Sequence, residues 1–172
     1  MSIKSLTILA CLATATLVGF TPTQIHAADL DRTVVGLKFE GPINVVYQIT
    51  SDDMKEGVNE GLFYLKRVHQ QYVDAGVDAS RLDIKAVFHS DASTSILTDK
   101  AWNKYQQTTG GNPNTALIEE LIANGIDIEF CNSRRISMKW EKSDIHSEVI
   151  LVGGAYTRLT DLQLLGYAYI KF

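Results

Sequence analysis

Short apolar runs recur from residue 43 to the end of the chain, separated by polar segments rich in turn-forming residues. Each run has the length and composition of a strand in the interior of a protein. The runs span residues 43–50, 81–91, 126–131, 147–155 and 167–172. Because most of them are apolar at consecutive positions, we expect strands that are covered on both faces of one sheet.

The segment after the first run has the pattern of an amphipathic helix. Apolar residues recur there at spacings of three and four, which places them on one face of a helix. They are Val58, Leu62, Leu65, Val68 and Tyr72. The turn-forming residue Gly76 marks the expected end of this helix.

Further helices are expected between the later runs. The clearest lies in 112–125, where Asn112 can act as the cap, Pro113 suits the first turn and Gly125 can close the helix. The others are expected in the middle of residues 95–111, within 134–142 and within 157–166. The order of elements is therefore strand, helix, strand through most of the chain.

Apolar strands that alternate with helices predict a single α/β domain. Only crossover helices can cover both faces of such a sheet, so we expect a three-layer α/β/α sandwich with a mostly parallel five-stranded sheet. About 145 residues after the N-terminal segment are enough for one such domain and too few for two. We expect this single domain to span residues 28–172.

The N-terminus has the pattern of a cleaved secretory signal. Lys4 precedes an apolar run that ends in small residues at Ala27 and Ala28. We expect residues 1–27 to be removed and the mature protein to be periplasmic or secreted. No later segment is apolar enough to hold the chain in a membrane. A lipid-bearing Cys11 is disfavoured, because a further apolar stretch follows it.

Composition and motifs exclude several classes of function. Acidic residues outnumber basic ones by 20 to 16, which argues against a nucleic-acid partner. There is no glycine-rich nucleotide motif, and no histidine or cysteine spacing that favours a metal site. We therefore expect neither a cofactor nor a bound metal.

Candidate site residues follow from the rule that ligands of parallel α/β sheets bind at the carboxyl edge of the strands. We expect a ligand to meet the residues that come directly after four of the strands. These residues are Thr50, Ser51, Asp52, His89, Ser90, Cys131, Asn132, Ser133, Arg134, Gly153 and Gly154. The glycines allow a ligand to approach the backbone, although a plain turn needs the same residues.

Cys131 is the only cysteine after the expected signal, so it cannot form a disulfide within the mature domain. It lies between a strand and an expected helix, where backbone N–H groups and the nearby Arg134 favour the thiolate form. His89 is the candidate base or orienting partner of this thiol. The alternative is a buried structural cysteine, because free cysteines often pack as small apolar residues.

Two segments resemble the DsrE/DsrF-like family. They are "LIEELIANGIDIEFCNSRR" and "SEVILVGGAYTRLTDLQLLGYAYIKF", and "AVFHSDAS" is similar to the second-strand region of the secreted, stand-alone branch. The resemblance implies a flavodoxin-like three-layer domain that assembles into small homo-oligomers. It also implies that Cys131 matches the position where sulfur-relay relatives carry a persulfide.

Two functions are then expected from different classes. The first is binding or transfer of sulfur, as a persulfide or a sulfoxyanion, through Cys131, with a sulfur-donor protein or a small sulfur-containing ligand as partner. The second is a non-catalytic, homo-oligomeric module that binds a small ligand, with Cys131 as a packing residue. The apolar and aromatic C-terminal segment favours self-association in both cases.

Overall fold

The computed structural model describes residues 33–172, so the expected signal peptide lies outside the described residues. A five-stranded sheet forms the centre of the fold, in the order β6-β5-β4-β1-β7, and every neighbouring pair is parallel. Its strands are β1 (Ile43–Ile49), β4 (Leu82–Phe88), β5 (Ile126–Cys131), β6 (Ile150–Val152) and β7 (Ala168–Lys171). The prediction of a mostly parallel five-stranded sheet is confirmed.

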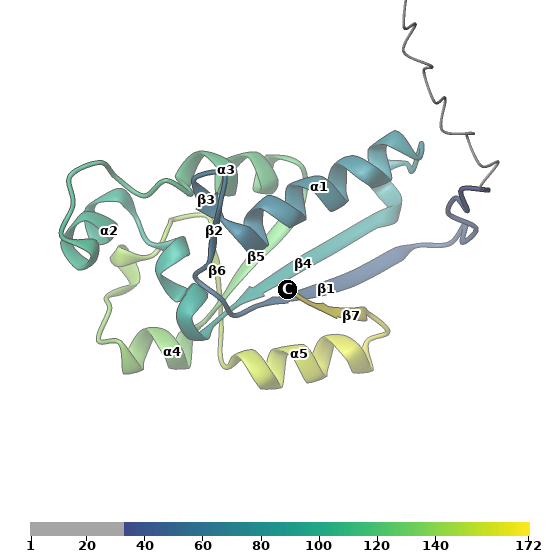
Figure 1. Ribbon diagram of the computed structural model, residues 1–172. Coiled ribbons are helices and arrows are strands. Elements are labelled where there is room, and N and C mark those ends of the chain that lie inside the picture. Colours follow the sequence, from purple (N-terminus) through teal and green to yellow (C-terminus); the bar gives the residue numbers. More distant parts are fainter. Residues whose placement is uncertain (1–32) are drawn as a thin grey trace, which may run out of the picture. The chain divides into compact units, whose positions relative to one another are not determined.

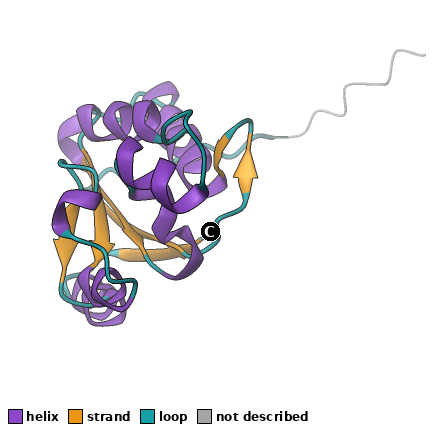
Figure 2. Ribbon diagram, turned by 90° about the vertical axis from the view of Figure 1, so that its left-hand side faces the viewer, coloured by secondary structure: helices purple, strands orange, loops and turns teal. Residues whose placement is uncertain are grey.

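Helices lie on both faces of this sheet (Figures 1 and 2). Helices α1 (Glu60–Asp74) and α3 (Thr115–Ala123) pack on one face, and α5 (Ala155–Leu164) packs on the other. The shorter helices are α2 (Asp99–Gln106) and α4 (Asn132–Ser137), and α4 starts directly at the end of β5. The expected α/β/α layers are therefore present.

The two faces of the sheet differ in polarity, and β5 illustrates this. Ile126, Ile128 and Phe130 belong to the large apolar core under α1 and α3. The alternate residue Glu129 pairs with α5 on the opposite face, where Cys131 joins a much smaller apolar core. The face under α5 therefore mixes charged and apolar side chains, and Cys131 lies at its carboxyl end.

Helix α1 matches its prediction except at its start, because Val58, expected on its apolar face, lies in strand β3 and the helix begins at Glu60. The Asn59 side chain caps it by accepting hydrogen bonds from the backbone N–H groups of Gly61 and Leu62. Leu62 and Leu65, from the predicted apolar face, are buried against the sheet. The chain leaves the helix through Gly76, whose φ of 71° favours glycine.

The start of α3 was predicted wrongly. The helix begins at Thr115, and Asn114 rather than Asn112 occupies the cap position. The side-chain oxygen of Asn112 accepts from the backbone N–H of Asn114 at 3.0 Å, in the turn before the helix. Its NH₂ group donates to the carbonyl oxygens of Ser95 and Leu97, at 2.9 and 2.6 Å. The side chain therefore joins this turn to the preceding segment.

Helix α4 and strand β6 also differ from expectation. A helix was expected within 134–142, but α4 begins at Asn132 and ends at Ser137. Lys139 then turns the chain with a φ of 57°, which brings Trp140 into the large core. Strand β6 is shorter than the expected 147–155.

Two features had no counterpart in the sequence prediction. A small hairpin, β2 (Met54–Lys55) and β3 (Val58–Asn59), precedes α1, and a 3-10 helix, Ser90–Ile96, follows β4. Two-residue strands are too short to leave a periodic pattern. Across residues 33–172, no helix combines the length and apolar character that a bilayer crossing needs.

Candidate functional site

A cavity of about 340 Å³ opens at the carboxyl edge of the sheet, beside the end of β5. The strand order explains its position, because β5 lies between β4 and β6 and all three end at this edge. The cavity is lined by His89, Ser90, Cys131, Ser133, Arg134, Gly154, Ala155, Tyr156 and Thr157. The sequence analysis had expected six of these residues at the site.

The thiol of Cys131 receives two backbone hydrogen bonds. The N–H of Arg134 in α4 donates to Sγ at 3.4 Å, and the N–H of Ala155, the first residue of α5, donates at 3.3 Å. Both N–H groups belong to helix starts, where the backbone carries a partial positive charge. The arrangement therefore favours a negative charge on this sulfur.

Cys131 is also largely enclosed by protein. The residue is 7% exposed and packs with Val46, Val87 and Leu159 in the small core under α5. The thiol thus has apolar side chains behind it and the cavity in front of it. Both the reactive and the structural interpretation of this cysteine have support in its surroundings.

His89 reaches the same cavity but does not pair with the thiol. Its Nε2 atom lies 2.7 Å from the side-chain nitrogen of Gln48, and its Nδ1 atom lies 3.0 Å from the hydroxyl of Ser90. Within residues 33–172, His89 makes no hydrogen bond to Cys131. The expected edge position is therefore observed, whereas the expected contact between base and nucleophile is not.

The surroundings of His89 favour its neutral form. Burial lowers the pKa of His89 below its ordinary value, and the positive charges of Lys171 and Arg134 lower it further. The ring of Tyr156 packs edge-on against the imidazole, with centroids 5.2 Å apart. An uncharged His89 suits an orienting role better than a charge-pairing one.

Arg134 supplies the positive charge of the cavity. Its side chain lines the cavity, and in the described part of the chain its buried Nε atom has no hydrogen-bond partner. Ser133 also lines the cavity, but its hydroxyl donates to the carbonyl oxygen of Gly153 at 2.8 Å. Arg134 is therefore the cationic side chain that an anionic ligand in this cavity would meet.

Several expected site residues lie elsewhere. Asn132 accepts a hydrogen bond from Arg135 and does not line the cavity. Thr50 follows β1, which is separated from β5 by β4, and Ser51 lines a different, small pocket beside the start of α1. The strand ends meet at one edge of the sheet, as expected. The strand order, however, places the end of β1 away from the Cys131 cavity.

The two glycines contribute differently. Gly154 lines the cavity and Gly153 does not, although its carbonyl oxygen anchors Ser133. A side chain at Gly153 would meet no atom within 4 Å, and the extended φ of Gly154, −150°, suits any residue. A side chain at Gly154 would come within 3.3 Å of the hydroxyl oxygen of Thr157, so there is little room for one beside the first turn of α5.

The sequence analysis missed Ala155, Tyr156 and Thr157, which line the cavity from the first turn of α5. It also missed the backbone of Ser90, whose φ is 56°. Non-glycine residues rarely adopt positive φ, and such outliers gather at functional sites. The three residues of α5 were missed because the strand was expected to run to residue 155 and the helix to begin at residue 157, whereas α5 begins at Ala155.

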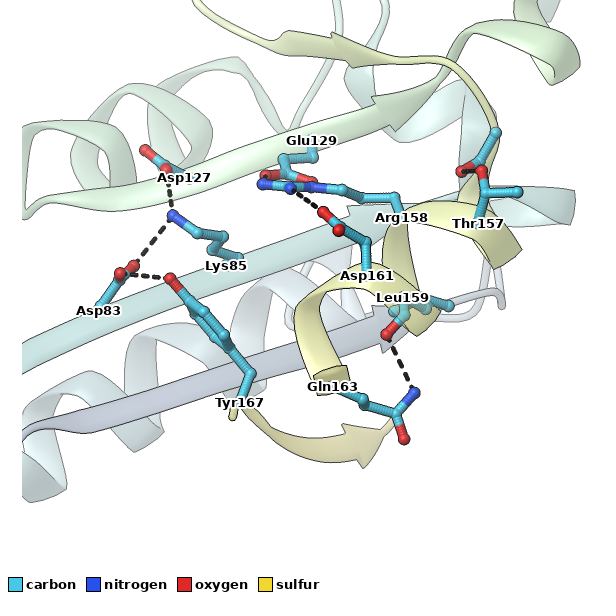
Figure 3. A network of polar contacts seen from close by, with 11 residues as sticks. Asp83, Lys85, Asp127, Glu129, Thr157, Arg158, Leu159, Asp161, Gln163 and Tyr167 are labelled. Atoms are coloured by element: carbon cyan, nitrogen blue, oxygen red, sulfur yellow. Dashed lines mark hydrogen bonds and ion pairs between the residues drawn. The ribbon is translucent and has the colours of Figure 1, made fainter. Parts of the chain in front are cut away.

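An ion-pair network next to the cavity ties α5 to the sheet (Figure 3). The guanidinium of Arg158 on α5 makes two hydrogen bonds, 2.8 and 2.7 Å, to the carboxylate of Glu129, which is 1% exposed. It also pairs with Asp161 on its own helix. This two-point ion pair fixes the rotation of α5 about its axis. It thereby positions the N–H group of Ala155, which donates to the sulfur of Cys131.

A second ion cluster lies further along the same face. Lys85 of β4 bonds the carboxylates of Asp127 and Asp83, and the Tyr167 hydroxyl donates to Asp83 (Figure 3). Burial opposes the charge of Lys85, but the two carboxylates outweigh it and raise the pKa of the ammonium group. Among residues 33–172, no group of three or more acidic, histidine and cysteine side chains is arranged to hold a metal ion.

Comparisons with known proteins identify relatives by family and by fold. A family model described as the DsrE/DsrF-like family matches residues 60–172. Two solved structures share the fold: MTH1491 from Methanobacterium thermoautotrophicum, a protein of unknown function, and the YchN protein from E. coli. No match was found among curated proteins.

The structural likeness covers the same share of this chain in both cases. MTH1491 gives a TM-score of 0.55 at 19% identity, covering 76% of this chain and 99% of its own. YchN gives a TM-score of 0.52 at 18% identity, covering 76% of this chain and 100% of its own. Both values support the expected flavodoxin-like fold and, at this identity, the fold alone.

Proposed function

Because the chain belongs to the DsrE/DsrF-like family, which is associated with sulfur relay, we propose that it carries sulfur as a persulfide on Cys131. The observation that carries this proposal is the pair of backbone N–H groups, from Arg134 and Ala155, that donate to Sγ at the wall of an open cavity. A persulfide anion would be stabilised by the same two helix starts.

The proposed loading step uses the charge of the cavity. A Cys131 thiolate attacks the outer sulfur of a donor such as thiosulfate, and a new S–S bond forms. The S–S bond of thiosulfate breaks, and sulfite leaves with the bonding electron pair. The persulfide keeps one negative charge, and Arg134 lies in the same cavity to offset the charge of the leaving sulfite.

A second candidate function follows from the burial of the thiol. With 7% exposure and apolar neighbours behind it, Cys131 fits a structural cysteine as well. In this case the cavity would hold a small ligand without chemistry. The two candidates differ in whether an added reagent reaches the sulfur of the folded protein.

We also propose that the protein is exported and forms homo-oligomers. Export rests on the signal-like N-terminal segment, which lies outside the described residues. Self-association is supported by exposed apolar side chains at the end of α5 and on β7, which is an edge strand. They are Leu164, Leu165, Tyr169 and Ile170.

The sulfur-carrier proposal is tested by incubating the purified protein with thiosulfate and measuring its intact mass. The wild type is expected to gain about 32 mass units, the mass of one sulfur atom, with release of one sulfite per chain. Cys131→Ser serves as the control and should gain nothing. Unchanged wild-type mass, with this donor and with polysulfide, would favour the ligand-binding module.

A further inference from the structure

A chain of hydrogen bonds runs from β7 across the sheet edge to the Cys131 cavity. The hydroxyl of Tyr169 donates to the side-chain oxygen of Gln48 on the neighbouring strand β1. This bond orients the amide, because its oxygen is engaged and its NH₂ group must face the other way. That NH₂ group lies 2.7 Å from Nε2 of His89 on β4.

The direction of these bonds determines where His89 carries its proton. An amide NH₂ can only donate, so Nε2 of His89 must accept and bears no hydrogen. The neutral ring then carries its hydrogen on Nδ1, which lies 3.0 Å from the hydroxyl oxygen of Ser90. The lowered pKa of His89, caused by burial and by the charges of Lys171 and Arg134, agrees with a neutral ring.

Ser90 is the end of this chain. Its oxygen accepts from His89, so its own hydrogen remains to be donated, and in the described residues no protein acceptor takes it. The residue lines the Cys131 cavity. Its φ of 56° is a conformation that glycine adopts far more easily, yet a serine is present there.

We propose that this chain makes the Ser90 hydroxyl an obligate donor to an anion bound in the cavity beside Cys131. Together with Arg134, it would hold the sulfonate end of a donor such as thiosulfate while the outer sulfur faces the thiol. This inference rests on the proposed sulfur chemistry for its biological meaning. Tyr169, Gln48 and His89 are positioning residues in it, and Ser90 contacts the ligand.

The first test measures the tautomer of His89 by ¹⁵N NMR, a property that does not depend on sulfur transfer. The wild type is expected to carry its hydrogen on Nδ1. Tyr169→Phe removes the bond that orients Gln48, so the Nε2-protonated form should increase. Tyr64→Phe is the matched control, because its hydroxyl accepts from Lys55 away from the cavity, and it should change nothing. A wild-type ring protonated on Nε2 would overturn the proposal.

The second test measures thiosulfate binding by NMR titration in Cys131→Ser protein, which cannot accept sulfur. Adding Ser90→Gly should weaken binding about tenfold or more, since a hydrogen bond to a charged group is lost. Gln107→Gly is the matched control, because Gln107 also has a positive φ, 53°, and does not line the cavity. It should leave binding unchanged.

The outcomes separate this inference from the proposed function. Equal thiosulfate affinity with and without the Ser90 hydroxyl, or no saturable binding at all, would overturn the role of Ser90. A wild type that binds thiosulfate through Ser90 but never gains sulfur would leave the anion site in place and refute the sulfur carrier.

Discussion

At the scale of single residues, the site combines a thiol that packs in a small apolar core with a histidine that bonds to other residues rather than to the thiol. The sulfur of Cys131 accepts a hydrogen bond from a backbone N–H group of α4 and another from the first N–H group of α5. It takes the place of the side-chain oxygen that usually caps the start of a helix. His89 is bonded to Gln48 and Ser90 and is not free to take a proton from the thiol. In the sulfur chemistry that we propose, activation of the thiol therefore rests on backbone N–H groups rather than on a side-chain base.

Ser90→Gly affects stability in two opposing ways. Glycine at this φ of 56° relieves about 1 kcal/mol of backbone strain, whereas loss of the hydroxyl leaves the buried Nδ1–H of His89 without its acceptor, which costs about 1 kcal/mol or more. The free energy of unfolding, measured by urea denaturation, should therefore change little, while thiosulfate binding weakens. A loss of stability above about 3 kcal/mol would instead identify Ser90 as a structural residue.

His89 predicts a specific dependence of stability on pH. Its pKa in the folded protein lies below the value of about 6.5 expected for the unfolded chain. When the pH falls through this window, the unfolded state takes up the proton first, and stability is lost. The loss begins near pH 6.5 and continues to the folded-state pKa.

The measurement is the free energy of unfolding as a function of pH. His89→Gln lacks the titrating group and should lose less stability than the wild type between about pH 6.5 and pH 5. Identical slopes for the two proteins would mean that burial does not keep His89 neutral.

At the scale of elements, α5 positions the site through a buried ion pair. Arg158→Ala leaves the buried Glu129 carboxylate without its partner and should cost about 3 kcal/mol of stability. Glu129→Ala should cost less, because Arg158 is partly exposed and keeps its pair with Asp161. The double variant Glu129→Leu/Arg158→Met should recover much of this loss, because an apolar pair replaces both charges. Thermal or urea unfolding measures these differences.

Asp161 provides the matched control for this prediction. It pairs with the same guanidinium, but its side chain is 59% exposed. Asp161→Asn should therefore cost less than about 1 kcal/mol. If Arg158→Ala were as mild as this control, the ion pair of Glu129 and Arg158 would not be what holds α5 on the sheet.

The sequence predicted those elements whose own residues form an apolar run or a periodic apolar face. Strands β1, β4 and β5 have apolar runs, and α1 has a regular apolar face, so their positions agree with the prediction. The failures depend on partners far away in the sequence. Asn112 looked like a cap, but its amide bonds two carbonyls of the preceding segment.

For the candidate site too, local patterns were predictable and contacts between distant elements were not. Cys131 and His89 were expected at one edge because each follows an apolar strand, and both line the cavity. Thr50 and Ser51 were expected there for the same reason, but strand order is not encoded locally and β4 separates β1 from β5. The pairing of Glu129 with Arg158 joins two elements and left no local pattern.

At the scale of the whole molecule, the described domain has an apolar surface at its C-terminal end. Leu164 and Leu165 are 84% and 64% exposed at the end of α5, and β7 is an edge strand with an open side. Burial of such a surface favours association. We expect light scattering to give a mass above that of one chain.

A charge on this surface should weaken the assembly. Leu165→Glu is expected to reduce the association constant about tenfold or more. Val73→Glu, at an exposed apolar residue of α1, is the control and should leave it unchanged. A wild-type protein that stays monomeric at micromolar concentration would contradict self-association.

The most direct test of the central claim is the rate at which Cys131 of the folded protein reacts with iodoacetamide at neutral pH. Two helix-start N–H groups on the sulfur and an adjoining cavity predict that the native thiol reacts faster than a model thiol and faster than the same cysteine in urea. A thiol that reacts only after the protein is denatured would contradict the account and identify Cys131 as a packing residue.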